Sequence, residues 1–219
     1  MMPLRIFISY ADEDKDVVGR IKRGLEHYGI DVFCAHDDIK PFSEWTEEII
    51  NELREADVIV SVHSDAFDAS DFTYQEIGFA LALGKRILPL KLNRAPHGFI
   101  SKYQALTVHK DVIGPACRTM FKRLCEDKKL EPKLRISATR ALADAESFAQ
   151  AEQKAQILLD FDHWTASQLD KVIYAMLSNS QALHSWGAHA VFEKISSSWG
   201  GPADEEAYND YETQYEEGI

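Results

Sequence analysis

The first 127 residues alternate short apolar segments, rich in β-branched residues, with longer segments whose apolar residues recur at helical spacing. The apolar segments are 4–10, 30–34, 57–64, 86–92 and 105–109. Helical patterns occupy 12–28, 45–56, 71–84 and 113–127. Strands and helices that alternate in this way form right-handed crossovers between parallel strands. Residues 1–127 are therefore predicted to form an α/β domain, a parallel sheet with helices on both faces. Pro89, inside the fourth apolar segment, predicts a bulge or a place near a sheet edge.

The alternation stops at Lys128. Residues 138–159 are rich in Ala, Glu and Gln and predict one long helix. Thr165 and Gln168 form a capping box before a second helix, and residues 188–195 suggest a third. We interpret 128–200 as a small helical extension, packed on the sheet domain or on a second subunit. Residues 201–219 form an acidic segment without Lys or Arg, which predicts a disordered, solvated tail.

Charge and composition exclude several classes of partner. The formal net charge of −12 argues against nucleic acid or an anionic membrane as the main partner. No apolar run approaches the roughly 20 residues that cross a bilayer, and the N-terminus does not resemble a signal peptide. The cysteines, Cys34, Cys117 and Cys125, are scattered and odd in number, as is typical of reduced thiols in a cytoplasm. The dispersed histidines give no metal-binding pattern, so we expect a cytoplasmic protein without a metal site.

The segment 71–84, DFTYQEIGFALALG, carries the candidate site. Ser70 or Asp71 can cap this helix, and Gly84 ends it where a left-handed residue is needed. Glu76 lies one turn after Phe72, so a carboxylate and an aromatic ring share one helix face. An isolated pair of this kind is more often a solvated acid and a core aromatic.

The predicted topology places other polar groups near Phe72 and Glu76. Ligands of parallel α/β sheets bind at the carboxyl ends of the strands. Polar groups follow three of the predicted strands, at Ser9, Tyr10, Asp37 and Ser64. We therefore expect these groups to converge with Phe72 and Glu76, and we expect Glu76 to lie at an exposed rim of the sheet.

Several motifs carry a family resemblance: RIFISYADEDK, GIDVFCAHDDIKPFSEW, ADVIVSVHSDAF and DFTYQEIGFALALGKRILPLKL. In this order and spacing they resemble the TIR (Toll/interleukin receptor) domain, in its bacterial, NAD-cleaving branch, which includes stand-alone antiphage (Thoeris-like) proteins. The resemblance covers residues 4–127 and implies a flavodoxin-like fold.

The resemblance also implies roles for single residues. It gives Glu76 as the catalytic glutamate, Phe72 as a ring stacked on the substrate, Asp37 as a ribose contact and Tyr10 as part of the pocket. Phe42 and Trp45 belong to a loop, called the BB loop, that controls access and assembly in relatives. Departures occur at Phe72, where relatives commonly carry Trp, at Thr73, where a cysteine or small residue is common, and at Phe42, where the loop often has Gly.

The resemblance implies an enzyme that needs no cofactor and takes NAD as its substrate. Cleavage of the nicotinamide–ribose bond would give nicotinamide with ADP-ribose or a cyclic product, in bacterial antiviral defence. It further implies self-association through TIR domains and a downstream effector that senses the product. Two alternatives stay open: a non-catalytic TIR assembly module, and a deoxyribosyl transferase of similar fold that uses the same glutamate.

Overall fold

The computed structural model describes residues 2–34, 45–197 and 205–217. Within this part, the chain divides into two compact units. One comprises 4–26 and 30–124, which we call the sheet unit, and the other comprises 1–3, 27–29 and 125–219, which we call the helical unit. We expected the division after residue 127.

The sheet unit is a five-stranded parallel sheet with strand order β2-β1-β3-β4-β5. The strands are β1 (Arg5–Ser9), β2 (Asp31–Cys34), β3 (Val58–His63), β4 (Arg86–Lys91) and β5 (Leu106–Thr107). The helices are α1 (Lys15–Glu26), α3 (Trp45–Glu55), α4 (Asp65–Ala69), α5 (Asp71–Ala82) and α6 (Gly114–Cys125), with 3-10 turns at Asp12–Asp14 and Gly98–Ile100. The predicted α/β fold and its five strands are confirmed.

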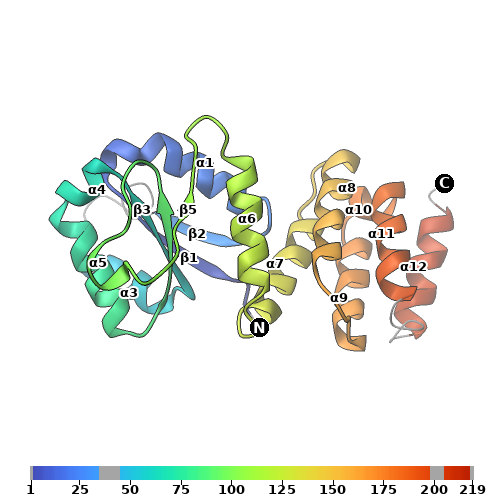
Figure 1. The fold of residues 1–219 in the computed structure, drawn as a ribbon. Coiled ribbons are helices and arrows are strands. Elements are labelled where there is room, and N and C mark those ends of the chain that lie inside the picture. Colours follow the sequence, from blue (N-terminus) through green and yellow to red (C-terminus); the bar gives the residue numbers. More distant parts are fainter. Residues whose placement is uncertain (1, 35–44, 198–204, 218–219) are drawn as a thin grey trace. The chain divides into compact units, whose positions relative to one another are not determined.

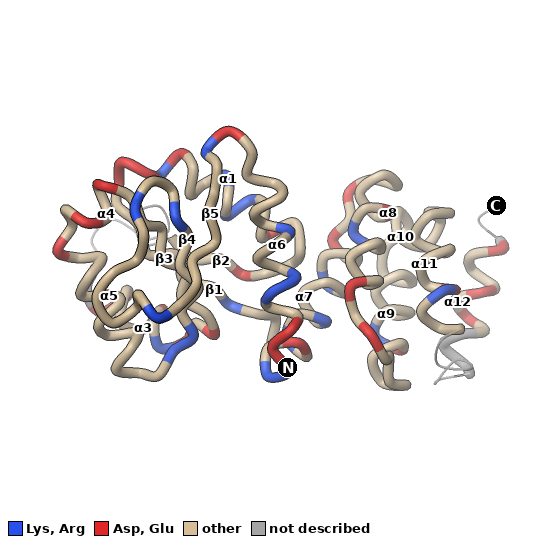
Figure 2. The backbone as a smooth tube through the Cα atoms, in the orientation of Figure 1, with Lys and Arg blue, Asp and Glu red and all other residues tan. Residues whose placement is uncertain are grey.

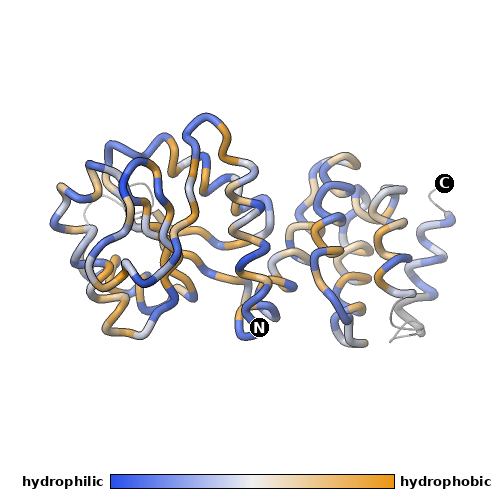
Figure 3. Tube along the Cα trace, in the orientation of Figure 1, coloured by the Kyte–Doolittle hydropathy of each residue, from blue (hydrophilic) through white to orange (hydrophobic). Residues whose placement is uncertain are grey.

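Helices cover both faces of the sheet. On one face, α3 and α5 bury Ile49, Leu53 and Ile77 against Phe7 and Ile59 of the strands. On the other, α1 and α6 approach so closely that a Cβ at Gly24 would lie 2.6 Å from the Cys117 Sγ. Hydrophobic residues follow the strands of this unit in Figure 3. Buried apolar strands between two helix layers explain why their sequences are continuous apolar runs rather than alternating ones.

Pro89 lies within β4, opposite Ser61 of β3. On the side of β4 away from β3, Leu90 and Lys91 are the only described residues that pair with β5. Pro89 therefore falls just short of the two-residue strand β5, where the loss of one backbone donor costs the sheet little. The expectation of a position near the edge of the sheet is correct in this local sense.

The helical unit contains α7 (Glu131–Ala143), α8 (Phe148–Ile157), α9 (Ala166–Leu177), α10 (Ser180–Leu183), α11 (Trp186–Ser197) and α12 (Glu205–Glu217), with a 3-10 turn at Leu158–Asp160. The prediction of one helix over 138–159 is wrong. Helix α7 ends with Asp144 as its C-cap. Ser147 then caps the start of α8 by accepting a hydrogen bond from the Gln150 N–H at 3.2 Å. The capping box of Thr165 and Gln168 is confirmed.

The disordered tail is also a wrong prediction for 205–217, which form α12 (Figure 2). Tyr211 is fully buried and meets the Phe192 ring with centroids 4.8 Å apart. Tyr215, one turn later, stacks on His189 at 3.8 Å. The acidic composition concealed an aromatic stripe at helical spacing, and that stripe holds the helix in place.

Candidate active site

Helix α5 positions the two residues on which the predicted site depends. It follows Ser70, which is in extended conformation, and ends at Ala82 with Leu83 as its C-cap, before Gly84 at φ +65°. This left-handed glycine lets the chain turn back into β4, as its place in the sequence predicts. Phe72 and Glu76 line one cavity, so their shared helix face is confirmed.

Glu76 is buried, with 8% of its surface exposed, so the expectation of an exposed position is wrong. The reason is that α5 packs over the end of β1. There the Ser9 hydroxyl, itself fully buried, donates a hydrogen bond of 2.5 Å to the Glu76 Oε2. A strand end and a helix far apart in sequence thus meet at this carboxyl, as the topology predicts.

The cavity beside Glu76 is small and mostly apolar. Its volume is about 160 Å³. The lining residues come from two helices: Ile49, Ile50 and Leu53 of α3, and Phe72, Gln75, Glu76 and Phe79 of α5. Sites that enclose a whole drug-sized ligand measure about 300–1,000 Å³. The described walls therefore accommodate one ring of a larger substrate, with the Phe72 ring, 51% exposed, at the surface beside it.

Burial raises the pKa of Glu76 to about 7, and the hydrogen bond from Ser9 lowers it in part. Among the described residues that line the cavity, no other side chain is charged. Near neutral pH the carboxyl is thus divided between its neutral and ionised forms. A positive charge brought next to it favours the ionised form.

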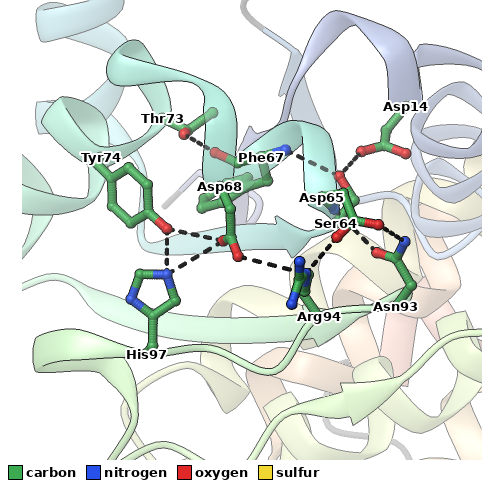
Figure 4. Close-up of polar contacts among 10 residues, drawn as sticks. All are labelled: Asp14, Ser64, Asp65, Phe67, Asp68, Thr73, Tyr74, Asn93, Arg94 and His97. Carbon is green, nitrogen blue, oxygen red and sulfur yellow. Dashed lines mark hydrogen bonds and ion pairs between the residues drawn. The ribbon is translucent and has the colours of Figure 1, made fainter.

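Ser64 and Tyr10, both expected at the site, do not line this cavity. Ser64 caps α4, accepting from the Phe67 N–H at 3.1 Å and donating to the buried Asp14 carboxylate (Figure 4). Tyr10 is 1% exposed and belongs to the core. Asp37 and Phe42 lie outside the described residues, and α3 begins at Trp45, whose side chain lies outside them as well.

A second polar cluster ties α4 and α5 to the loop after β4 (Figure 4). The Asp68 carboxylate accepts from the Tyr74 hydroxyl at 2.9 Å and lies 3.4 Å from His97. Burial and this carboxylate raise the pKa of Tyr74 to about 12, so the phenol stays protonated. Nearby His63 has its pKa lowered to about 4, chiefly by burial, and is neutral at physiological pH. These groups brace the segment before Glu76.

The sheet unit also matches a family model. The model that describes the TIR domain covers residues 6–125. The chain belongs to the TIR domain family. Among curated proteins, none matches it significantly.

Several solved structures are similar to this TIR protein. The TIR domain of the Toll-related receptor TRR-2 from Hydra magnipapillata is 24% identical, with a TM-score of 0.46, over 54% of this chain and 95% of that one. A CMP N-glycosidase from Clostridium botulinum is 19% identical, with a TM-score of 0.40, over 53% and 97% of the two chains. A 2-desoxiribosyltransferase from Leishmania mexicana is 19% identical, with a TM-score of 0.35, over 47% and 73%.

Sequence reasoning missed part of the wall of this TIR cavity. Phe79 follows Phe72 and Glu76 at helical spacing, and that spacing was a usable signal. Ile49 and Leu53 belong to the helical pattern predicted over 45–56, and they contribute both to the core and to the cavity. Gln75 gave no signal, because an isolated glutamine on a helix is common.

The helical unit of the TIR protein has a cavity of its own, of about 430 Å³. Its wall includes Arg135, 5% exposed, which hydrogen-bonds Glu131 at 2.5 Å and donates to the Asp162 carbonyl. The guanidinium lies 4.8 Å from the ring centroids of both Phe161 and Trp164. We assign this arginine to the packing of the unit.

Two kinds of feature are absent from the described part of the TIR protein. No helix there is long and apolar enough to cross a membrane. No cluster of three or more His, Cys, Asp or Glu side chains there has the arrangement of a metal site.

Proposed function

We propose that this TIR domain cleaves NAD at the nicotinamide–ribose bond, with Glu76 as the catalytic carboxylate. One observation carries the proposal. A buried carboxyl, the sole charged group on the described cavity wall, shares that wall with an exposed aromatic ring. A carboxyl kept in such surroundings opposes folding when it ionises, so its presence there favours a chemical role.

A single carboxylate is chemically sufficient for this reaction. Glycosidases usually need a second carboxyl group to protonate the leaving group. Nicotinamide departs from NAD as a neutral molecule, so no general acid is required. Positive charge develops on the ribose instead, and a carboxylate in apolar surroundings stabilises it strongly.

The substrate itself favours the active form of the enzyme. The nicotinamide ring of NAD is cationic, and a cation beside Glu76 lowers the pKa of the carboxyl from about 7. Binding therefore ionises the group that stabilises the transition state. The Phe72 ring, at the mouth of the cavity, stacks on a flat ring of the substrate in this proposal.

The acceptor of the ribose determines the product. Water as acceptor gives ADP-ribose, and a group of the substrate itself gives a cyclic product. We place the reaction in bacterial antiviral defence, with an effector that senses the product.

The proposal assigns different work to the remaining predicted residues. Tyr10 and Ser64 hold the fold, whereas Asp37, Phe42 and Trp45 keep the roles implied by the family, ribose contact and assembly. Assembly through the loop predicts that specific activity rises with protein concentration. A Phe42→Asp variant is then expected to fold and to be inactive at every concentration. Constant specific activity over a wide dilution series would contradict this part.

Purified protein incubated with NAD tests the main proposal, with nicotinamide and ADP-ribose products separated by chromatography and identified by mass. We expect Glu76→Gln to release no nicotinamide, and Glu26→Gln, exposed on α1, to match the wild type. A parallel incubation with deoxynucleosides tests the transferase alternative. Wild-type turnover in Glu76→Gln would refute the assignment. A folded wild-type protein inert toward both substrates would favour the assembly module.

A further inference from the structure

Ser9, one of the groups expected at the site, is buried and does not line the cavity beside Glu76. It ends β1, which lies between β2 and β3 in the sheet, and its side chain is fully buried. Its hydroxyl hydrogen-bonds the Glu76 Oε2 at 2.5 Å. Ser9 thus contacts the Glu76 carboxyl from the protein interior and is not part of the cavity wall.

The hydrogen bond makes the two oxygens of Glu76 unequal. Oε2 is occupied by Ser9, whereas no described residue hydrogen-bonds Oε1. Glutamate side chains have three rotatable bonds, and a misplaced reactive group costs much of the rate that orientation provides. A single donor on one oxygen removes rotational freedom and leaves the other oxygen available to a ligand in the cavity.

We propose that Ser9 is a positioning residue for the reaction: its hydroxyl holds Oε2 so that Oε1 is presented to the substrate ribose. The inference rests on the proposed function, because it needs Glu76 to be the catalytic carboxylate. Ser9 itself touches neither substrate nor reacting atoms.

No other described residue around the cavity holds the Glu76 carboxyl by a side-chain hydrogen bond. The other described residues that line the cavity are Ile49, Ile50 and Leu53 from α3, and Phe72, Gln75 and Phe79 from α5. None of these described side chains is charged, and none hydrogen-bonds Glu76. The strand contributes the donor, and a donor to a carboxylate favours its ionised form. Ser9 thus acts on both the orientation and the ionisation of Glu76.

The test compares Ser9→Ala and Ser9→Cys with Ser61→Ala. Cysteine keeps the volume and supplies only a weak donor. Ser61 is a matched control, since it is fully buried, lies opposite Ser9 on β3, and has its hydroxyl 3.0 Å from the His63 Nε2. Circular dichroism and thermal melts establish that each variant folds.

Two measurements separate positioning from a structural role. The first is the titration of the Glu76 side-chain carboxyl by carbon-13 NMR in labelled full-length protein. We expect its midpoint to rise by about one pH unit or more in both Ser9 variants, since a hydrogen bond to a charged group is lost. The second is NAD cleavage, where we expect kcat to fall about tenfold or more with KM nearly unchanged. The acid limb of the kcat profile should move to higher pH, and Ser61→Ala should move neither quantity.

The outcomes distinguish the two proposals. Wild-type kcat and a wild-type titration midpoint in a folded Ser9 variant would overturn the role of Ser9, and so would an equal change in Ser61→Ala. If the wild-type protein cleaves no NAD, the proposed function fails. The NMR titration then still reports whether Ser9 controls the Glu76 carboxyl.

Discussion

Replacement of Glu76 by glutamine should stabilise the sheet unit at the pH values where it removes activity. Burial raises the pKa of Glu76 from 4.5 to about 7. In the unfolded chain the group ionises near its ordinary value, so its ionisation opposes folding increasingly between pH 4.5 and 7, and fully above 7. The difference corresponds to roughly 3 kcal/mol, at about 1.36 kcal/mol per unit of pKa.

Glutamine recovers only part of this amount. Its carbonyl still accepts from Ser9, but its amide N–H groups face an apolar wall, which costs about 1–2 kcal/mol. We expect a net stabilisation of about 1–2 kcal/mol at pH 8, shrinking to zero or below at pH 4.5. The gain is the opposite of what most substitutions of a buried residue produce.

Urea unfolding followed through the amide signals of residues 58–63 measures the sheet unit alone, which avoids treating a two-unit chain as one transition. Glu26→Gln serves as the control and should change nothing at either pH. If Glu76→Gln is no more stable than the wild type at pH 8, or if its gain is the same at both pH values, the carboxyl is not held in the apolar environment described above.

Further substitutions test other parts of the structure. Tyr211→Ala should destabilise the helical unit by about 3–5 kcal/mol, because it removes the buried ring that docks α12; unchanged urea unfolding would show that α12 adds nothing. Gly24→Ala should cost about 1–3 kcal/mol, since its Cβ would lie 2.6 Å from the Cys117 Sγ, and adding Cys117→Ala should recover most of the loss. Phe72→Ala should leave the free energy of unfolding within about 0.5 kcal/mol, because half of the ring is exposed, but raise KM for NAD, whereas Phe72→Trp stays active. A large stability loss in both Phe72 variants would instead place the ring in the core.

The fold of the sheet unit was predictable because its signals are local and agree with one another. Apolar runs, a capping residue and a left-handed glycine at Gly84 each act over a few residues, and the handedness of crossovers then sets the topology. Helix α4 was missed because its five residues are too few to show a period. Helix α12 was missed because composition averages over a segment, whereas docking depends on single buried residues such as Tyr211.

The sequence predicts which residues come together at the site, but not how deeply each of them is buried. Topology brings Ser9 and Glu76 to the same end of the sheet, and the sequence contains both. Which of them faces a ligand depends on how deeply α5 packs over β1, and no local pattern records that depth. The sequence therefore did not predict that Glu76 lines the cavity from a buried position, or that Ser9 is buried and contacts it without lining the cavity.

The contact between Ser9 and Glu76 joins residues 67 positions apart in the chain. Contacts of such separation tend to form late in folding, because the entropy cost of closing the long loop between the two residues comes before the contact can stabilise the chain. On a growing polypeptide, β1 emerges before α5, so a chain synthesised only as far as β1 lacks the Ser9–Glu76 contact of the proposed site. The topology thus delays any activity that depends on this contact until both β1 and α5 have been synthesised and have packed together.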